Sequence, residues 1–98
     1  MKKSDLVSLR KAIDVIDAKL VELLARRFEI VKDIAVLKKE KQINVHDPER
    51  IIHVKNSRTE LARKHNVPVD LVLSIYEDII KSSMEYENDV IKGKCNKK

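Results

Sequence analysis

Residues 6–37 read LVSLRKAIDVIDAKLVELLARRFEIVKDIAVL, and apolar side chains recur in this stretch every three or four positions. This apolar stripe consists of Leu6, Leu9, Ile13, Ile16, Leu20, Leu23, Ile30, Ile34 and Leu37. Because neither proline nor glycine occurs between Ser4 and Asp47, the spacing predicts one amphipathic helix of roughly 35 residues with a heptad pattern, ending near Glu40. Arg27 occupies the one position at which the stripe should be apolar and is not, and its charge requires an anionic partner.

The composition of the chain indicates its fold class. Ninety-eight residues suffice for one small domain, and 43% hydrophobic residues with one glycine and two prolines favour helices over strands and turns. We therefore predict an all-α fold. The net charge of +5 is weak support for nucleic-acid binding, because aromatic residues make up only 3% of the chain and leave little for base stacking. We expect no nucleic-acid partner.

The cysteine content and the N-terminal residues indicate a compartment. Cys95 is the single cysteine, so a disulfide framework is excluded and a reducing environment is the simpler assumption. Met1 to Lys3 is basic but is followed by charged residues rather than by the apolar core of a signal peptide. No stretch approaches the ~20 apolar residues of a membrane span. We expect a soluble, cytoplasmic protein with no membrane partner.

Two sets of helix start and stop signals predict two shorter helices after the long one. Asp47-Pro48 combines an N-cap residue with proline at the first helical position, so a second helix starts there and runs to about His65. Asn66-Val67-Pro68 again ends one helix and begins the next, so a third helix runs from about Pro68 to Ile91. We assign residues 1–91 to one helical domain and residues 92–98 to a basic, solvated tail without an assigned function.

The length of the first helix predicts self-association. At 1.5 Å per residue the helix is about 50 Å long, whereas a compact domain of this size is only about 30 to 35 Å across. The two shorter helices would leave several turns of the apolar stripe bare. A homodimer in which the long helices pair would cover them.

Cations on the first helix are candidate binding residues. The 11-residue step from Arg27 to Lys38 brings these side chains within about 20° of each other, three turns apart, so both can reach one cavity. Arg10 is rotated by about 100° from Arg27 and lies some 25 Å away along the axis. It therefore cannot reach that cavity from the same chain, but in an antiparallel or crossed dimer it could reach the cavity of the partner chain.

The third helix carries polar residues on an inward-looking row, which consists of Val72, Tyr76, Ile80, Ser83, Glu87 and Val90. Ser83 and Glu87 are its polar members and lie one turn apart. Asp47 and Arg50, at the start of the second helix, complete the candidate set of cations, carboxylates and a hydroxyl.

Each candidate also has a structural explanation when it is taken alone. Arg27 could set the register of a helix pair through a glutamate, and Glu87 could be its ion-pair partner. Arg10 and Lys38 could be solvated surface residues, Asp47 an N-cap and Ser83 a small core residue. The three histidines lack companion ligands at metal spacing, so we predict no metal site at His46, His53 or His65.

The ordered set of these residues resembles the all-α chorismate mutases. The resemblance rests on Leu9-Arg10-x-x-Ile13-Asp14-x-Ile16-Asp17, Leu23-Leu24-Ala25-Arg26-Arg27, Lys38, Asp47-Pro48-Glu49-Arg50, and Ser83 with Glu87. It runs from about Leu6 to Glu87, which is nearly the whole chain. It implies an intertwined homodimer of three-helix chains, in which each site uses residues of both chains.

The resemblance also implies an activity, which is the pericyclic rearrangement of chorismate to prephenate in phenylalanine and tyrosine biosynthesis. This one-substrate reaction needs no metal, cofactor or covalent intermediate. The protein would therefore act by positioning the substrate and by stabilising the transition state electrostatically. By similarity, Arg27 and the partner's Arg10 would clamp the two carboxylates of the substrate.

The remaining members of the set take their expected roles from the same resemblance. Arg50 and Ser83 would assist in binding, and Asp47 would help to hold the substrate hydroxyl. Lys38 would donate to the ether oxygen, where negative charge grows as the carbon-oxygen bond breaks. The expected catalytic residues are therefore Lys38, Glu87 and Arg27.

Ile51 departs from the common pattern, because many chorismate mutases place a glutamate there that accepts a hydrogen bond from the ring hydroxyl. An apolar residue after this arginine also occurs in the isochorismate pyruvate lyases of salicylate synthesis, which are close relatives on the same scaffold. The chain could therefore be a mutase, which the overall pattern favours, or a lyase. A third hypothesis is a non-catalytic helical adaptor that has kept the scaffold.

Glu87 is a second departure, because many relatives carry glutamine there. An amide donates to the ether oxygen at any pH, whereas a glutamate donates only when it is protonated. We predict that turnover falls as the pH rises and Glu87 loses its proton, and that Glu87→Gln flattens the pH profile of kcat. A wild-type profile that is independent of pH would remove Glu87 from the ether contact.

Overall fold

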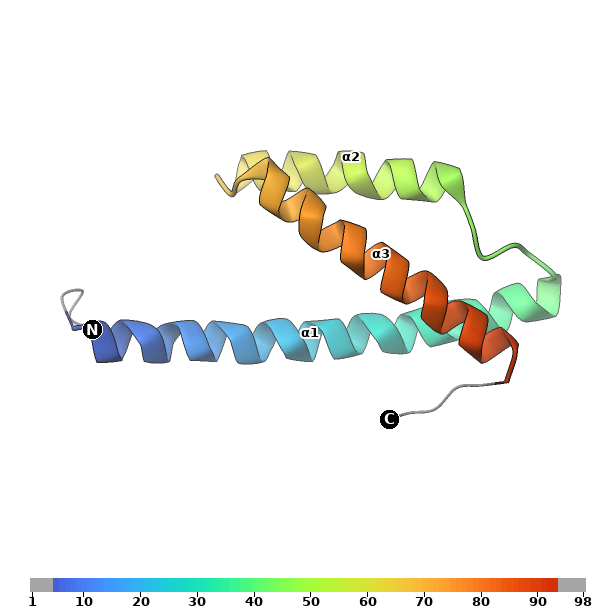
Figure 1. Ribbon diagram of the computed structural model, residues 1–98, viewed down its shortest axis with the longest axis horizontal. Helices are drawn as coiled ribbons and strands as arrows, with labels where there is room; N and C mark the ends of the chain where they lie inside the picture. Colours follow the sequence, from blue (N-terminus) through green and yellow to red (C-terminus); the bar gives the residue numbers. More distant parts are fainter. Residues whose placement is uncertain (1–4, 94–98) are drawn as a thin grey trace. The chain divides into compact units, whose positions relative to one another are not determined.

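The computed structural model describes residues 5–93, nearly all of which lie in three α-helices (Figure 1). Helix α1 spans Leu6–Lys41, α2 spans Pro48–Lys64 and α3 spans Val69–Ile91. No strand occurs among the described residues, so the predicted all-α class is confirmed. None of the helices in residues 5–93 is both long and apolar enough to cross a membrane. Cys95 and most of the predicted tail lie outside the described residues.

Aspartate side chains cap the N-termini of α1 and α2. Asp5 Oδ1 accepts a hydrogen bond from the Val7 amide at 3.1 Å, and its Oδ2 accepts one from the Ser8 hydroxyl at 2.9 Å. The Ser8 hydroxyl bond, helped by the backbone amides, lowers the pKa of Asp5 below its ordinary value. Asp47 Oδ1 accepts from the Arg50 amide at 3.1 Å, directly before Pro48 at the first helical position.

The C-terminus of α1 is closed by a left-handed residue that is not glycine. Gln42 has a φ of 57°, and its amide donates to the Lys39 carbonyl at 3.3 Å. The Ile43 amide donates to the Lys38 carbonyl at 2.9 Å. These two bonds form a Schellman motif, which satisfies carbonyls that the last turn of a helix leaves without partners.

The same motif ends α2. Asn66 has a φ of 58°, its amide donates to the Arg63 carbonyl at 3.2 Å, and the Val67 amide donates to the Ala62 carbonyl at 2.9 Å. The chain then turns at Pro68, and α3 runs back from the end of α2 (Figure 1).

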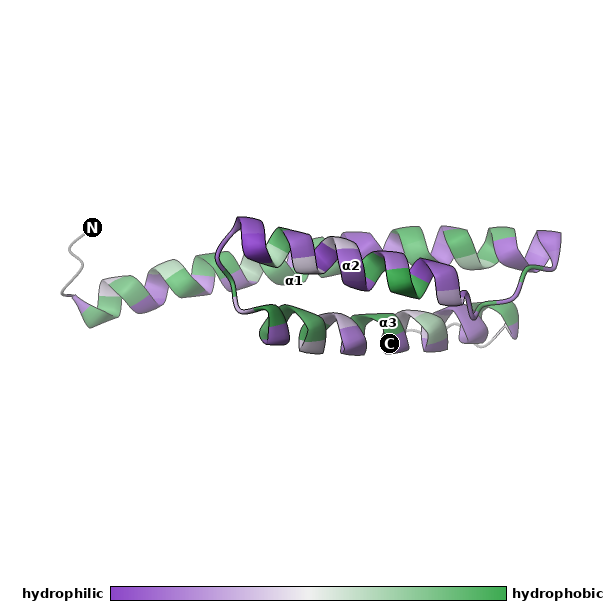
Figure 2. Cartoon of the chain, turned by 90° about the horizontal axis from the view of Figure 1, so that it is seen from above, coloured by the Kyte–Doolittle hydropathy of each residue, from purple (hydrophilic) through white to green (hydrophobic). Residues whose placement is uncertain are grey.

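The chain divides into two compact units, Met1–Ile30 and Val31–Lys98. In the described part of the first unit, apolar and polar residues alternate around α1 (Figure 2). The apolar stripe is open to solvent there: Leu20, Leu23 and Ile30 are 52%, 58% and 60% exposed. Arg27 is half-buried, whereas Arg10 is exposed.

The second unit contains the C-terminal part of α1 together with α2 and α3. Its core is small, with Val31 and Ala35 buried on α1 and Val54 and Ala62 buried on α2. Helices α2 and α3 are further joined by two contacts of their side chains. Lys55 Nζ lies 3.2 Å from Glu77 Oε1, and the Arg58 guanidinium carbon lies 5.3 Å from the centre of the Tyr76 ring.

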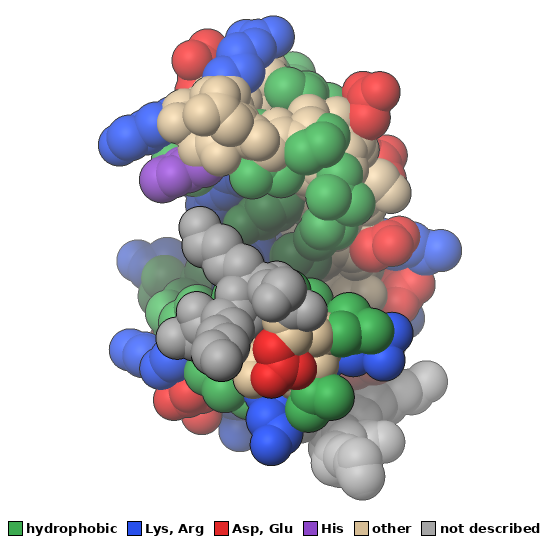
Figure 3. Space-filling model, turned by 90° about the vertical axis from the view of Figure 1, so that its left-hand side faces the viewer, with side chains coloured by type: hydrophobic (Ala, Val, Ile, Leu, Met, Phe, Trp, Pro, Cys, Tyr) green, Lys and Arg blue, Asp and Glu red, His purple; other side chains and the backbone are tan. Residues whose placement is uncertain are grey.

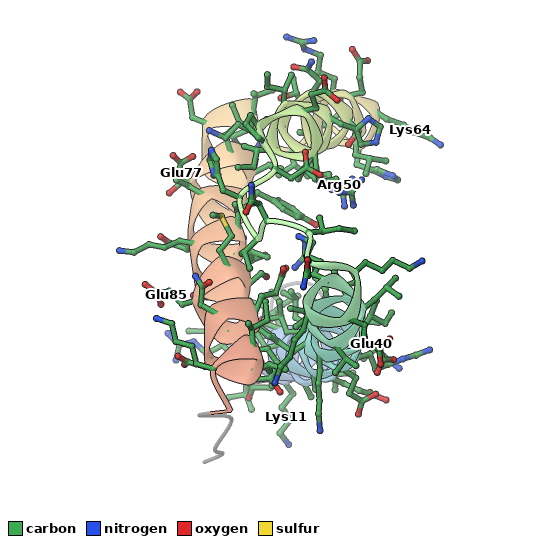
Figure 4. The ribbon with its side chains drawn as sticks, turned by 90° about the vertical axis from the view of Figure 1, so that its right-hand side faces the viewer. Lys11, Glu40, Arg50, Lys64, Glu77 and Glu85 are labelled. Carbon is green, nitrogen blue, oxygen red and sulfur yellow. The ribbon has the colours of Figure 1, made fainter. Side chains whose placement is uncertain are left out.

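The predicted inward row of α3 is confirmed. Ser83 and Glu87 are buried, and the apolar members and Tyr76 are at least half-buried. By contrast, Glu85 is exposed and points outward from α3 (Figure 4). The sequence pattern thus identified the face of α3 that packs inside the second unit.

The apolar stripe is not the face of α1 that packs inside the second unit. Val31, Ala35 and Lys38 are buried or half-buried, whereas Ile34 and Leu37 of the stripe remain 40% and 47% exposed. The two sets are rotated by roughly a quarter of a turn around the helix axis. Hydrophobic side chains accordingly lie open at the surface between charged ones (Figure 3).

Candidate active site

An ion pair between α1 and α3 is the centre of the candidate site. Lys38 Nζ, in the last turns of α1, lies 3.0 Å from Glu87 Oε1, in the last turns of α3. The side chains are only 16% and 9% exposed. Because little water reaches either side chain, each charge is stabilised mainly by the opposite charge of its partner.

The Lys38 ammonium has a second partner that the sequence did not indicate. Nζ donates a hydrogen bond to the backbone carbonyl of Val45 at 3.1 Å. The contact with Glu87 is an ion pair by distance, but its angles are not those of a hydrogen bond, and no hydrogen bond reaches Glu87 Oε1 from residues 5–93. The aligned bond of the ammonium is therefore the one to Val45, whereas Glu87 supplies the countercharge.

Two further candidate residues lie at the N-terminus of α2. Asp47 is exposed and caps the helix, and the exposed Arg50 lies in its first turn (Figure 4). The structure joins these two through the Asp47 side chain and the Arg50 amide. Ser83 lies one turn before Glu87 on α3 and is equally buried, at 7% exposure.

The structure thus brings Lys38 together with Glu87, and Asp47 together with Arg50, all within the second unit. Arg10 and Arg27 lie on α1 within the first unit. The partner of Glu87 observed here is Lys38. The sequence alone indicates Arg27 as a possible ion-pair partner of Glu87, and the structure pairs Glu87 with Lys38.

The chemistry available at this site is hydrogen-bond donation and charge compensation in a poorly solvated setting. A lysine ammonium has three donors, and a glutamate can add one when it is protonated. No group of three or more metal-ligating side chains occurs in the described part of the chain. The arrangement suits the binding of an anionic substrate and the stabilisation of negative charge that develops on an oxygen.

Comparisons with known proteins identify the class to which this all-α chain belongs. Residues 9–88 match the model of the family described as chorismate mutase type II. The match covers most of the chain and includes every candidate site residue. The chain therefore belongs to the chorismate mutase type II family.

Individual relatives agree with the family assignment. The chain is 30% identical over 92 residues to a chorismate mutase of Methanocaldococcus jannaschii, covering 94% of this chain and 93% of that protein. It is 33% identical over 86 residues to the T-protein of Enterobacter agglomerans, covering 88% of this chain but 23% of that protein. A bifunctional chorismate mutase/prephenate dehydratase of Buchnera aphidicola is 31% identical over 94 residues, which are 96% of this chain and 24% of that protein.

The burial of the Lys38 and Glu87 pair leads to a prediction about stability. We expect Lys38→Met to lower the free energy of unfolding by about 3 kcal/mol, because it leaves a buried carboxylate without its countercharge. The matched control is Lys55→Met at the more exposed pair with Glu77, which should cost less than about 1 kcal/mol. Urea denaturation of both variants at one protein concentration measures the difference. Equal losses would show that the pair at Lys38 is no more than a surface contact.

Proposed function

We propose that this chain catalyses the rearrangement of chorismate to prephenate, in the cytoplasm and as a homodimer. The single observation that carries the proposal is the poorly solvated Lys38 ammonium, held 3.0 Å from Glu87 within a chain of the chorismate mutase type II family. A chorismate mutase of nearly the same length is 30% identical to it.

The reaction breaks the ether carbon-oxygen bond and forms a carbon-carbon bond within one molecule, and no proton or group leaves. Negative charge builds on the ether oxygen in the transition state. In our proposal the Lys38 ammonium donates to that oxygen, and a donor held in place away from water can contribute about 3 to 4 kcal/mol. Glu87 donates to the same atom only after its carboxylate has taken up a proton from solvent.

The substrate carboxylates require cations, and arginines suit them because guanidinium groups bind carboxylates through two parallel hydrogen bonds. We assign this role to Arg27 and to the partner's Arg10, with help from Arg50. The buried Ser83 hydroxyl and Asp47 would contact the remaining polar groups of the substrate.

The homodimer is supported by the exposure of the apolar stripe on α1. Ile13, Ile16 and Leu20 are 55%, 59% and 52% exposed, and further stripe residues on the same helix are similarly open. Apolar side chains in such a continuous row on one helix favour association over solvation. Pairing of two α1 helices would also place an arginine of each chain within reach of the other. We propose residues 1–91 as the helical domain and the residues after it as a basic tail.

The lyase alternative rests on Ile51, which is half-buried in the first turns of α2 and offers no hydrogen-bond acceptor from its side chain. The two activities are separated by supplying purified protein with each substrate. We expect prephenate from chorismate. Pyruvate and salicylate from isochorismate would instead establish the lyase, and turnover of neither would leave a non-catalytic helical protein.

Arg27→Ala distinguishes a substrate clamp from a residue that sets helix register. We expect kcat/KM with chorismate to fall by at least about a hundredfold, because a charge-assisted contact with the substrate is lost, while the dimer persists. Arg26→Ala removes the neighbouring, exposed cation and should leave the rate within about twofold. Steady-state kinetics and sedimentation measure both properties. A variant that dissociates but retains its activity per folded site would contradict the clamp.

A further inference from the structure

The loop between α1 and α2 binds both the backbone carbonyl and the side-chain ammonium of Lys38. The Ile43 amide donates to the backbone carbonyl of Lys38 at 2.9 Å, and the ammonium of Lys38 donates to the Val45 carbonyl at 3.1 Å. Backbone groups of residues two apart in the loop therefore bind the main chain and the side chain of one lysine. A lysine side chain is long and flexible, so such a double attachment restricts where its charge can lie.

The conformation of the loop depends on Gln42. Its φ of 57° lies in the left-handed region, which residues with a Cβ adopt at a cost and which β-branched residues adopt least readily. The Schellman motif at this residue turns the chain so that Ile43 and Val45 follow the end of α1 closely.

We infer that the left-handed turn at Gln42 and the Val45 carbonyl together position the Lys38 ammonium for the substrate. The inference rests on the proposed function for the identity of that substrate. The ammonium has three donors, and its hydrogen bond to the Val45 carbonyl uses one of them. Gln42 and Val45 touch no substrate in this account and act through Lys38 as positioning residues.

Asn66 provides a matched control, because it closes α2 with the same motif and a φ of 58° but lies away from Lys38 in the sequence. We expect Gln42→Val to lower kcat by about tenfold with KM within about twofold, because the turn that places Lys38 is disfavoured. Asn66→Val should lower the melting temperature similarly and keep kcat within about twofold. Gln42→Gly should keep the wild-type kcat, since glycine adopts this conformation readily.

These kinetic results decide the inference whenever the wild type turns over chorismate. Equal losses of kcat in Gln42→Val and Asn66→Val would overturn it, as would an unchanged kcat in Gln42→Val.

A nitrogen NMR signal of the Lys38 ammonium tests the same inference without turnover. We expect a slowly exchanging signal in the wild type and in Asn66→Val, and its loss in Gln42→Val. Glu87→Gln should retain the signal, because the aligned hydrogen bond goes to Val45; this variant also serves if Gln42→Val does not fold. Loss of the signal in Glu87→Gln would overturn the inference. A wild type with the expected signals but without turnover would defeat the proposed function and leave the positioning of Lys38 established.

Discussion

The placement of one positive charge at the end of a long helix determines what this molecule can do. The Lys38 ammonium is removed from most of its water, is bound to the Val45 carbonyl and has its charge balanced by Glu87. Burying such a pair costs desolvation that its attraction barely offsets, so it is a poor way to stabilise a fold. In the proposed function, the same burial keeps a strong hydrogen-bond donor shielded from water until the anionic substrate binds.

The rest of the second unit serves that placement. The Asp47 cap starts α2 at a fixed residue, the Schellman motif at Gln42 ends α1, and the packing of α2 against α3 brings Glu87 back to the end of α1. The apolar stripe of α1 serves a different purpose. Its exposure in a chain of the chorismate mutase type II family supports the proposed dimer, which would add a cation from the second chain.

The helices and the inward face of α3 could be predicted from the sequence, because Asp47-Pro48 and Asn66-Val67-Pro68 are strong local signals and Ser83 and Glu87 interrupt an apolar row. The role of Val45 could not be predicted, since a backbone carbonyl leaves no trace in residue identity. The left-handed conformation of Gln42 was equally hidden, because no glycine marks it. The contact of Lys38 with Glu87 depends on tertiary packing, and the sequence indicated Arg27 rather than Lys38 as a possible ion-pair partner of Glu87.

The central claim is that the Lys38 ammonium donates to the substrate's ether oxygen as negative charge develops there. Steady-state kinetics with chorismate for Lys38→Met, beside the control Lys55→Met at the more exposed pair with Glu77, measure this contribution directly. We predict that kcat falls by at least about a hundredfold in Lys38→Met and stays within about twofold in Lys55→Met. A folded Lys38→Met variant with the wild-type kcat would contradict the claim.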